Sequence, residues 1–230
     1  MPLTLQQSDI MPLDYLWKPR EAVDKTTLQH FEKELQISEV FLSLLLQRNI
    51  SNRSQAEVFF NPDLQKLHDP FLMKDMDKAV KRIVGAISAQ EKIMVYGDYD
   101  VDGTTAVALF SAFLEKHHSQ VITYIPDRYK EGYGVSQAGI DYAKEQNITL
   151  IVALDCGIKA NEKVEYASLK GIDFIICDHH TPGPELPKAV AVLDPKRSDC
   201  HYPYKGLSGC GVGFKLVQAL CKEWDLSDQH

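Results

Sequence analysis

The 230-residue sequence has few cysteines and no long apolar runs. Its five cysteines form no CxxC pair, which argues against both a disulfide framework and a zinc knuckle. The apolar run over residues 148–154 has the length of a strand and is far too short to span a membrane. The first nine residues contain neither a basic segment nor an apolar core. The sequence therefore predicts no membrane association, no secretion signal and a reducing, cytoplasmic setting.

Basic residues are also scarce, since 25 lysines and arginines face 32 aspartates and glutamates, for a net charge of -7. This balance does not predict a general nucleic-acid-binding surface. A cluster of carboxylates that holds divalent cations would add to the same negative charge. Charge alone therefore does not exclude an enzyme that acts on nucleic acid.

Two regions of the chain differ in their pattern. Residues 1–89 are predicted to form a small helical extension, with apolar residues at helical spacing over residues 76–88. From residue 90 to residue 230, short apolar strands alternate with helices, which predicts an α/β domain with a mostly parallel, doubly wound sheet. The predicted strands are residues 93–96, 121–125, 150–154, 174–177 and 189–193, and the predicted helices are residues 104–116, 136–145, 161–169 and 212–224.

Three carboxylates follow the first predicted strand, in the segment GDYDVDGTT. Asp98, Asp100 and Asp102 occupy alternate positions, and their mutual repulsion would be offset by a divalent cation. A solvated turn is an equally good interpretation of this segment alone. An EF-hand loop is rejected because its twelfth position is Leu109 and the intervening residues are predicted to be helical. Asp100-Val-Asp102-Gly-Thr also matches the nucleophile segment of haloacid dehalogenase-type phosphatases, which stays open at this point.

Two further predicted strands end in residues that can bind metal. Asp155 follows residues 150–154, and Asp178, His179 and His180 follow residues 174–177. The carboxyl ends of parallel strands meet at one edge of a sheet, where functional groups gather. Imidazole and carboxylate ligands suit manganese, zinc or iron, and a shell rich in carboxylates favours manganese or magnesium. Two ions bridged by Asp155 could activate a water for phosphoryl displacement.

Three motifs carry a family resemblance: GDYDVDGTTA at 97–106, ALDCG at 153–157 and CDHHTPG at 177–183. In this order they resemble the first three motifs of the DHH phosphoesterase superfamily. Within this superfamily the chain resembles the RecJ family, because three further segments are similar to it: residues 67–80, 125–134 and 202–216. It implies a 5′-to-3′ exonuclease that acts on single-stranded DNA in recombination and repair, with two Mn²⁺ or Mg²⁺ ions. A single-strand-binding protein and a recombination helicase would be its partners, and a monomer is expected.

The resemblance also implies residue roles. The implied metal ligands are Asp98, Asp100, Asp102, Asp155 and His179, with Asp98 either a ligand or a neighbouring carboxylate. Asp178 would orient its neighbours, and His180 would contact the scissile phosphate or protonate the leaving group. Arg128 would hold the terminal phosphate of the DNA, although an exposed surface arginine is as good an interpretation. The amides of Gly209 and Gly211, before the last predicted helix, could bind an anion or could instead allow close packing.

RecJ proteins continue beyond the segment matched here, with a further aspartate for the metal site, a DHH-associated domain and an OB-like domain. This sequence is therefore expected to be a fragment with an incomplete ligand set. Three alternatives to a RecJ-type nuclease stay open. They are a phosphodiesterase for oligonucleotides or cyclic dinucleotides, a dehalogenase-type phosphatase with Asp100 as nucleophile, and a non-catalytic scaffold.

Overall fold

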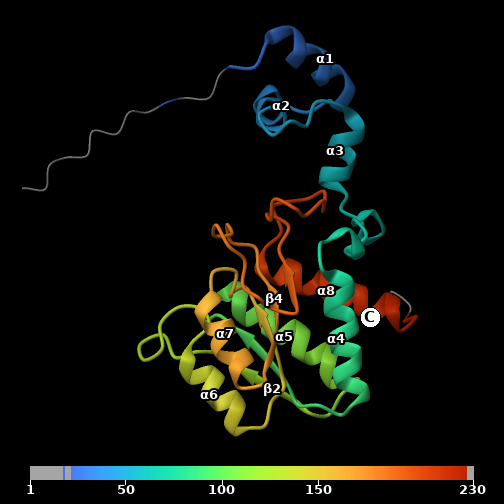
Figure 1. Ribbon diagram of the computed structural model, residues 1–230. Helices are drawn as coiled ribbons and strands as arrows, with labels where there is room; N and C mark the ends of the chain where they lie inside the picture. Colours follow the sequence, from blue (N-terminus) through green and yellow to red (C-terminus); the bar gives the residue numbers. More distant parts are fainter. Residues whose placement is uncertain (1–17, 19–21, 227–230) are drawn as a thin grey trace, which may run out of the picture. The chain divides into compact units, whose positions relative to one another are not determined.

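The structure is a computed structural model that describes Lys18 and residues 22–226 (Figure 1). The prediction of no secretion signal concerns residues 1–9, which lie outside this range. Residues 227–230 also lie outside it. The chain divides into two compact units, one up to Leu67 and the other from His68 onward. Among the described residues, no helix is long and apolar enough to cross a membrane.

The first unit is a small helical body with its own core. It contains α1 (Lys25–Leu35), α2 (Glu39–Leu46), α3 (Arg53–Phe60) and the 3-10 turn η1 (Leu64–Lys66). Side-chain caps define where two of the helices begin: Asp24 accepts a hydrogen bond from the Thr27 amide, and Asn52 accepts one from the Gln55 amide. The buried core residues are Leu28, Phe31, Leu42, Leu45 and Ala56.

The second unit is built on a five-stranded, all-parallel sheet in the order β2-β1-β3-β4-β5. The strands are β1 (Ile93–Gly97), β2 (Val121–Tyr124), β3 (Leu150–Leu154), β4 (Asp173–Cys177) and β5 (Ala191–Leu193). The other elements are η2 (Pro70–Leu72), α4 (Met76–Ser88), α5 (Val101–Glu115), α6 (Gln137–Glu145), α7 (Asn161–Leu169) and α8 (Gly209–Glu223). The parallel α/β architecture confirms the predicted fold class.

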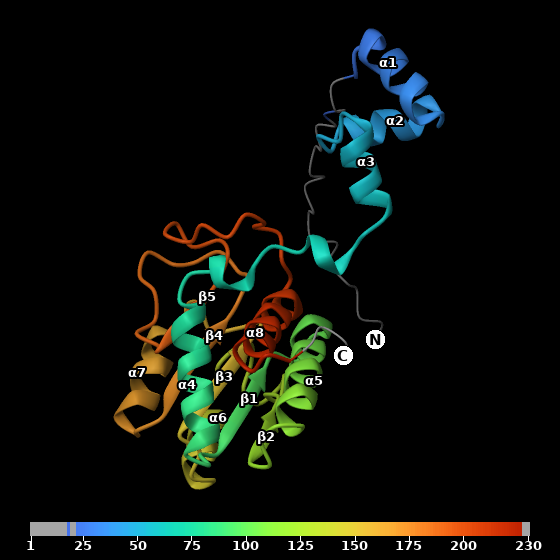
Figure 2. The ribbon, with the colours of Figure 1, turned by 90° about the vertical axis from the view of Figure 1, so that its right-hand side faces the viewer.

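Helices cover both faces of the sheet (Figure 2). Alternate strand residues such as Val95 and Val152 face a core shared with α4, α5 and α8. Their neighbours Met94 and Ile151 face a second core shared with α6 and α7. Successive side chains of a strand point to opposite faces, so a strand buried on both sides becomes apolar throughout. This explains why β1 and β3 are continuous apolar runs.

Helix α4 corrects the predicted domain boundary. The pattern of the sequence predicts residues 76–88 as part of the helical extension of 1–89, but α4 belongs to the second unit, which begins at His68. Its buried residues Met76, Ala79 and Ile83 share a core with the sheet. Helical periodicity correctly predicted the helix, but periodicity does not identify the surface against which a helix packs.

The chain order of the strands reverses between β1 and β3, which lie side by side at the centre of the sheet. The helix after β1, α5, packs on one face, and the helix before β3, α6, packs on the other. In open parallel sheets such a reversal leaves a crevice at the carboxyl ends of the two strands, where ligands bind. Asp98 and Asp155 directly follow these two strands.

Candidate metal centre

Asp98 and Asp155 are buried carboxylates at the carboxyl ends of β1 and β3. Their exposed fractions are 0% and 1%. Within the described residues, neither oxygen of either carboxylate has a hydrogen-bond partner. Burial raises the pKa of Asp155 to about 7, and the charges of Asp102 and Asp100 act in the same direction. Such groups are costly unless a cation neutralises them, and divalent cations are bound by carboxylate oxygens of this kind.

The backbone of Asp155 adds a second cost, because its φ of 62° lies in the left-handed region. For a residue other than glycine this conformation costs about 1–3 kcal/mol and is concentrated at functional sites. The Asp155 amide is held by a 2.8 Å hydrogen bond to the carbonyl of Cys177 on β4. The fold therefore fixes this carboxylate in a strained position at the sheet edge.

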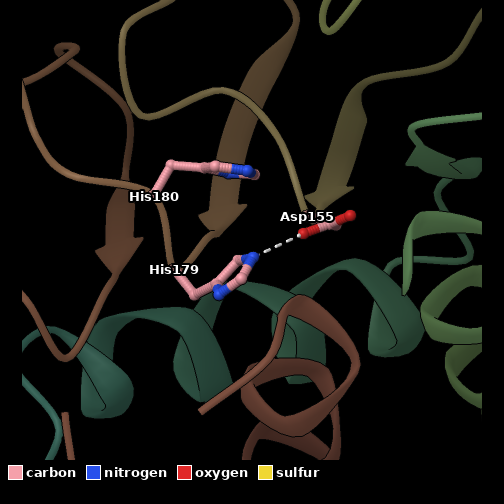
Figure 3. Close-up of side chains that lie close together, drawn as sticks. All are labelled: Asp155, His179 and His180. Atoms are coloured by element: carbon pink, nitrogen blue, oxygen red, sulfur yellow. Dashed lines mark ion pairs between the residues drawn. The ribbon is translucent and has the colours of Figure 1, made fainter. Parts of the chain in front are cut away.

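Both histidines extend from the loop after β4 toward Asp155 (Figure 3). His179 Nε2 lies 3.2 Å from Asp155 Oδ1 and 3.6 Å from Asp102 Oδ2. Asp155, His179 and His180 each offer one ligand atom, and these three atoms lie within 4.8 Å of one another. A carboxylate with two imidazoles in this spacing is a donor set that fits a divalent transition-metal ion.

Asp178 has the opposite environment, since it is surrounded by donors. Its Oδ1 accepts hydrogen bonds from the amides of His179 and His180, at 2.7 and 3.1 Å, and lies 2.7 Å from His180 Nδ1. Its Oδ2 accepts a 2.9 Å hydrogen bond from the Ile158 amide. Asp178 therefore holds the backbone of both histidines and the ring of His180, and its role in positioning metal ligands stays a prediction.

His180 is held from both sides. Partial burial, followed by the charges of Asp98 and Asp155, raises the pKa of Tyr133 well above its usual range. The Tyr133 hydroxyl keeps its proton and lies 3.2 Å from His180 Nε2. Because the Asp178 carboxylate can only accept, the proton of the neutral imidazole lies on Nδ1, and Nε2 then accepts from Tyr133.

Asp100 and Asp102 lie at the start of α5, which begins three residues earlier than predicted. Asp100 caps the helix by accepting a 3.0 Å hydrogen bond from the Gly103 amide. Because Val101 to Glu115 is helical, the structure supports the rejection of an EF-hand loop. The cap engages one oxygen, Oδ1, of the carboxylate that a dehalogenase-type enzyme would use as nucleophile.

The backbone amides at the start of α8 donate hydrogen bonds to side chains of the same chain. The Gly209 amide donates to Asp102 Oδ2 at 2.7 Å, the Cys210 amide donates to Asp102 Oδ1 at 2.8 Å, and the Gly211 amide donates to Ser208 Oγ at 3.0 Å. The predicted anion-binding role of Gly209 and Gly211 is therefore not supported, because both amides already have acceptors. The alternative, close packing, applies at Gly209, where an added Cβ would lie 2.2 Å from Asp155 Oδ1.

Arg128 lies in the loop between β2 and α6, outside the cluster of carboxylates and histidines. It is exposed, and its guanidinium carbon lies 5.3 Å from the centre of the Tyr99 ring. Tyr99 in turn makes an edge contact with Tyr133, at 6.0 Å between ring centres. Glu131 fixes this loop by accepting hydrogen bonds from the Tyr124 hydroxyl and the Asp127 amide, both at 2.8 Å.

Sequence reasoning missed Tyr99, Tyr133 and Asp194. Tyr99 lies between Asp98 and Asp100, and Tyr133 lies between two glycines of positive φ, so each had a local signal. Tyr133 also lines a cavity of about 570 Å³ beside His180. Asp194 follows β5 and is fully buried, and burial raises its pKa to about 6. An isolated aspartate before a proline gave no sign of this burial.

The fold and the site together define a parallel α/β protein with a candidate metal centre of carboxylates and histidines at the β1–β3 crevice. Residues 92–229 match the DHH family, N-terminal domain. This match covers more than half of the chain, and the chain therefore belongs to the DHH family.

Curated relatives and solved structures agree with this assignment. The chain is 44% identical over 200 residues to the single-stranded-DNA-specific exonuclease RecJ of Bacillus subtilis, covering 87% of this chain and 25% of that protein. It is 39% identical over 149 residues to RecJ of Escherichia coli, covering 64% of this chain and 26% of that protein. A crystal structure of exonuclease RecJ bound to manganese matches with a TM-score of 0.63 and 30% identity, over 68% of this chain and 40% of that one.

A RecJ structure from Thermus thermophilus in complex with Mn²⁺ matches with a TM-score of 0.70 over 90% of this chain and 29% of that one. At 23% identity this match shows the fold alone. The chain spans about a quarter of the length of the curated RecJ proteins named above.

Proposed function

We propose that this chain carries the metal-dependent catalytic site of a RecJ-type exonuclease, which hydrolyses single-stranded DNA from its 5′ end. One observation carries the proposal: Asp98 and Asp155 are buried and accept no hydrogen bond in the described structure, and His179 Nε2 lies 3.2 Å from Asp155 Oδ1. The manganese-bound RecJ structure, at 30% identity, supports the choice of metal. Two Mn²⁺ or Mg²⁺ ions are the proposed cofactors.

The proposed ligands are Asp98, Asp100, Asp102, Asp155 and His179, and Asp100 also caps α5 through its Oδ1. Carboxylates predominate in this set, as expected for manganese or magnesium, and one imidazole favours manganese over magnesium. Bound ions would supply Lewis acidity and neutralise charge that develops on the phosphate. The oxygens of Asp98 and Asp155, which accept no hydrogen bonds, would belong to this donor set.

The protein's own residues are proposed to orient the substrate and to supply a proton to the leaving oxygen. Asp178 fixes the His180 ring, so that Nε2 faces the site and Nδ1 faces Asp178. When the scissile phosphate displaces the Tyr133 hydroxyl from Nε2, Nε2 can take up a proton from solvent and then donate it to the leaving oxygen. Arg128 is proposed to bind the 5′-terminal phosphate, since a planar guanidinium can hold two phosphate oxygens.

The test is degradation of 5′-labelled single-stranded DNA by the full chain with Mn²⁺. The proposal expects release of labelled mononucleotides, little release from duplex DNA, and none after Asp155→Ala. Asp77→Asn is the matched control, because Asp77 is an exposed carboxylate on α4 and should not affect the reaction. Degradation that persists in EDTA or in Asp155→Ala would contradict the proposal, and activity restricted to short oligonucleotides or cyclic dinucleotides would favour the alternative phosphodiesterase.

Arg128 has a separate test. Hydrogen bonds to charged groups contribute about 1.5–3 kcal/mol, so Arg128→Ala should lower the preference for 5′-phosphorylated over 5′-hydroxyl ends by about 10- to 100-fold. Rates on 5′-hydroxyl DNA should change little, because no terminal phosphate is bound there. Lys130→Ala is the control, since Lys130 is an exposed cation of the same loop. Equal preferences in wild type and Arg128→Ala would assign Arg128 to the surface instead.

A cytoplasmic location, a monomeric state, and binding to a single-strand-binding protein or a recombination helicase stay predictions.

A further inference from the structure

The start of α8 touches two of the proposed metal ligands. Both oxygens of Asp102 accept backbone hydrogen bonds, Oδ2 from Gly209 at 2.7 Å and Oδ1 from Cys210 at 2.8 Å. These contacts join residues that are 107 and 108 positions apart in the sequence. They are short, as expected for hydrogen bonds to an ionised carboxylate.

A carboxylate held in this way can still bind a metal. Each carboxylate oxygen has two lone pairs, so an oxygen that accepts one amide proton keeps one acceptor position. Asp102 Oδ2 lies 3.6 Å from His179 Nε2, so the same oxygen that receives the Gly209 proton also faces the site. Asp102 is thus bound to α8 and turned toward His179 and Asp155.

Gly209 makes a second contact that depends on the absence of a side chain. A Cβ at this position would lie 2.2 Å from Asp155 Oδ1 and 2.5 Å from Asp155 Cβ. Only a glycine at position 209 therefore allows the backbone of α8 to approach Asp155 this closely. The position of α8 is fixed further along, where Val212, Leu216 and Leu220 are buried in the core shared with α5.

We infer that the first turn of α8 is a positioning element for the metal centre, which binds no substrate itself. Its amides at 209 and 210 hold the Asp102 carboxylate in one orientation, and its bare backbone at 209 leaves room for Asp155. The positive end of the α8 dipole also offsets part of the negative charge that Asp102 brings to the cluster. This inference rests on the proposed metal-dependent function for its consequence, but the contacts themselves can be tested without metal.

The first experiment removes one amide. Proline is tolerated in the first turn of a helix, so Cys210→Pro deletes the N–H that Asp102 accepts while α8 can still form. Cys210→Ala lacks the thiol but keeps the N–H, so comparison with it separates the effect of the N–H from the effect of the thiol. Mn²⁺ binding to the full chain, measured by electron paramagnetic resonance of free Mn²⁺, should be about 10- to 100-fold weaker in Cys210→Pro than in Cys210→Ala, as for loss of other groups that orient metal ligands.

Glu162→Pro places a proline at the corresponding position of α7 and controls for its general effect on a helix start. Equal Mn²⁺ affinity in Cys210→Pro and Cys210→Ala, with the protein folded by circular dichroism, would overturn the inference.

A second measurement keeps the inference testable if Cys210→Pro does not fold. In metal-free wild-type protein, the amide protons of Gly209 and Cys210 should exchange slowly and resonate downfield. Both properties should be lost in Asp102→Ala and retained in Asp77→Ala. Fast exchange of both amides in the wild type would refute the contact itself. A wild-type chain with protected amides but no Mn²⁺ binding would instead contradict the proposed function and leave the contact standing.

Discussion

The aspartates that follow the central strands β1 and β3 have an environment opposite to that of the aspartate that follows the neighbouring strand β4. Asp98 and Asp155, after β1 and β3, are buried and accept no hydrogen bond within the described chain, although His179 Nε2 lies 3.2 Å from Asp155 Oδ1. Asp178, after β4, is equally buried but accepts hydrogen bonds from three amides and lies 2.7 Å from a histidine nitrogen. All three residues follow strands of one parallel sheet, so neither sequence position nor burial explains the difference.

The difference distinguishes two roles that a buried carboxylate can have. A buried carboxylate without donors is unstable as an anion and gains most from a cation. A buried carboxylate with a full set of donors is already stable and gains little from one. Asp98 and Asp155 therefore fit the role of metal ligands, and Asp178 fits the role of a residue that fixes His179 and His180. The comparison can be tested by removing each kind of carboxylate.

The largest effect is expected from Asp155→Ala, which removes a buried carboxylate that accepts no hydrogen bond and lies 3.2 Å from His179 Nε2. Metal ions supply several kcal/mol of charge stabilisation in the transition state, so the loss should lower Mn²⁺-dependent cleavage by about 10³-fold or more. Mn²⁺ binding, measured by calorimetry, should weaken in parallel. Without metal, the same variant should lose little stability toward urea, since the removal of a buried acid offsets the greater cost of alanine in the left-handed backbone at 155. Marked destabilisation of the metal-free protein would show that Asp155 is a structural residue.

A smaller effect is expected from Asp178→Asn. The amide can still accept hydrogen bonds through one oxygen, but its NH₂ group is brought against backbone N–H donors. His179 and His180 should lose their fixed orientation, and Mn²⁺ affinity should fall by about 10- to 100-fold, as for other residues that orient metal ligands. The urea midpoint should fall as well, in contrast to Asp155→Ala. Unchanged Mn²⁺ affinity would remove the proposed link between Asp178 and the metal ligands.

Much of the fold follows from local patterns in the sequence. The strand at residues 150–154 and the helix at residues 161–169 were predicted at their observed limits, because apolar runs and helical periodicity are properties of the segment itself. The starts of α5 and α8 were each predicted three residues too late. Both begin with residues that interrupt the apolar pattern, such as Gly103 and Gly209, and both are capped by the preceding residue, Asp100 or Ser208.

The meeting of these aspartates at one edge of the sheet could also be predicted, but their different environments could not. Parallel strand ends bring Asp98, Asp155 and Asp178 to one edge whatever their partners are. Which of them has donors depends on loop backbones, such as the Ile158 amide that reaches Asp178. The contact between Asp102 and α8 joins residues more than 100 positions apart, so no local pattern could reveal it.

The smallest effect is expected at Asp194, a buried carboxylate that lies between the two extremes. Its Oδ1 accepts a 2.7 Å hydrogen bond from the Lys196 amide, while Oδ2 has no partner among the described residues. Burial raises its pKa to about 6 from an ordinary value of 3.8, so the folded state holds a proton that the unfolded state releases between these two values. The free energy of unfolding should therefore fall as pH rises from about 4 to about 6, by at most about 1.4 kcal/mol for each unit of the shift.

Asp194→Asn removes this titration, so the variant should gain stability relative to the wild type as pH rises through this window. Urea unfolding in EDTA at pH 4.5 and pH 7 measures the gain. A difference between variant and wild type that is the same at both pH values would show that Asp194 is as well stabilised as Asp178. In that case, unpartnered carboxylates would be confined to β1 and β3 among the buried strand-end aspartates described here.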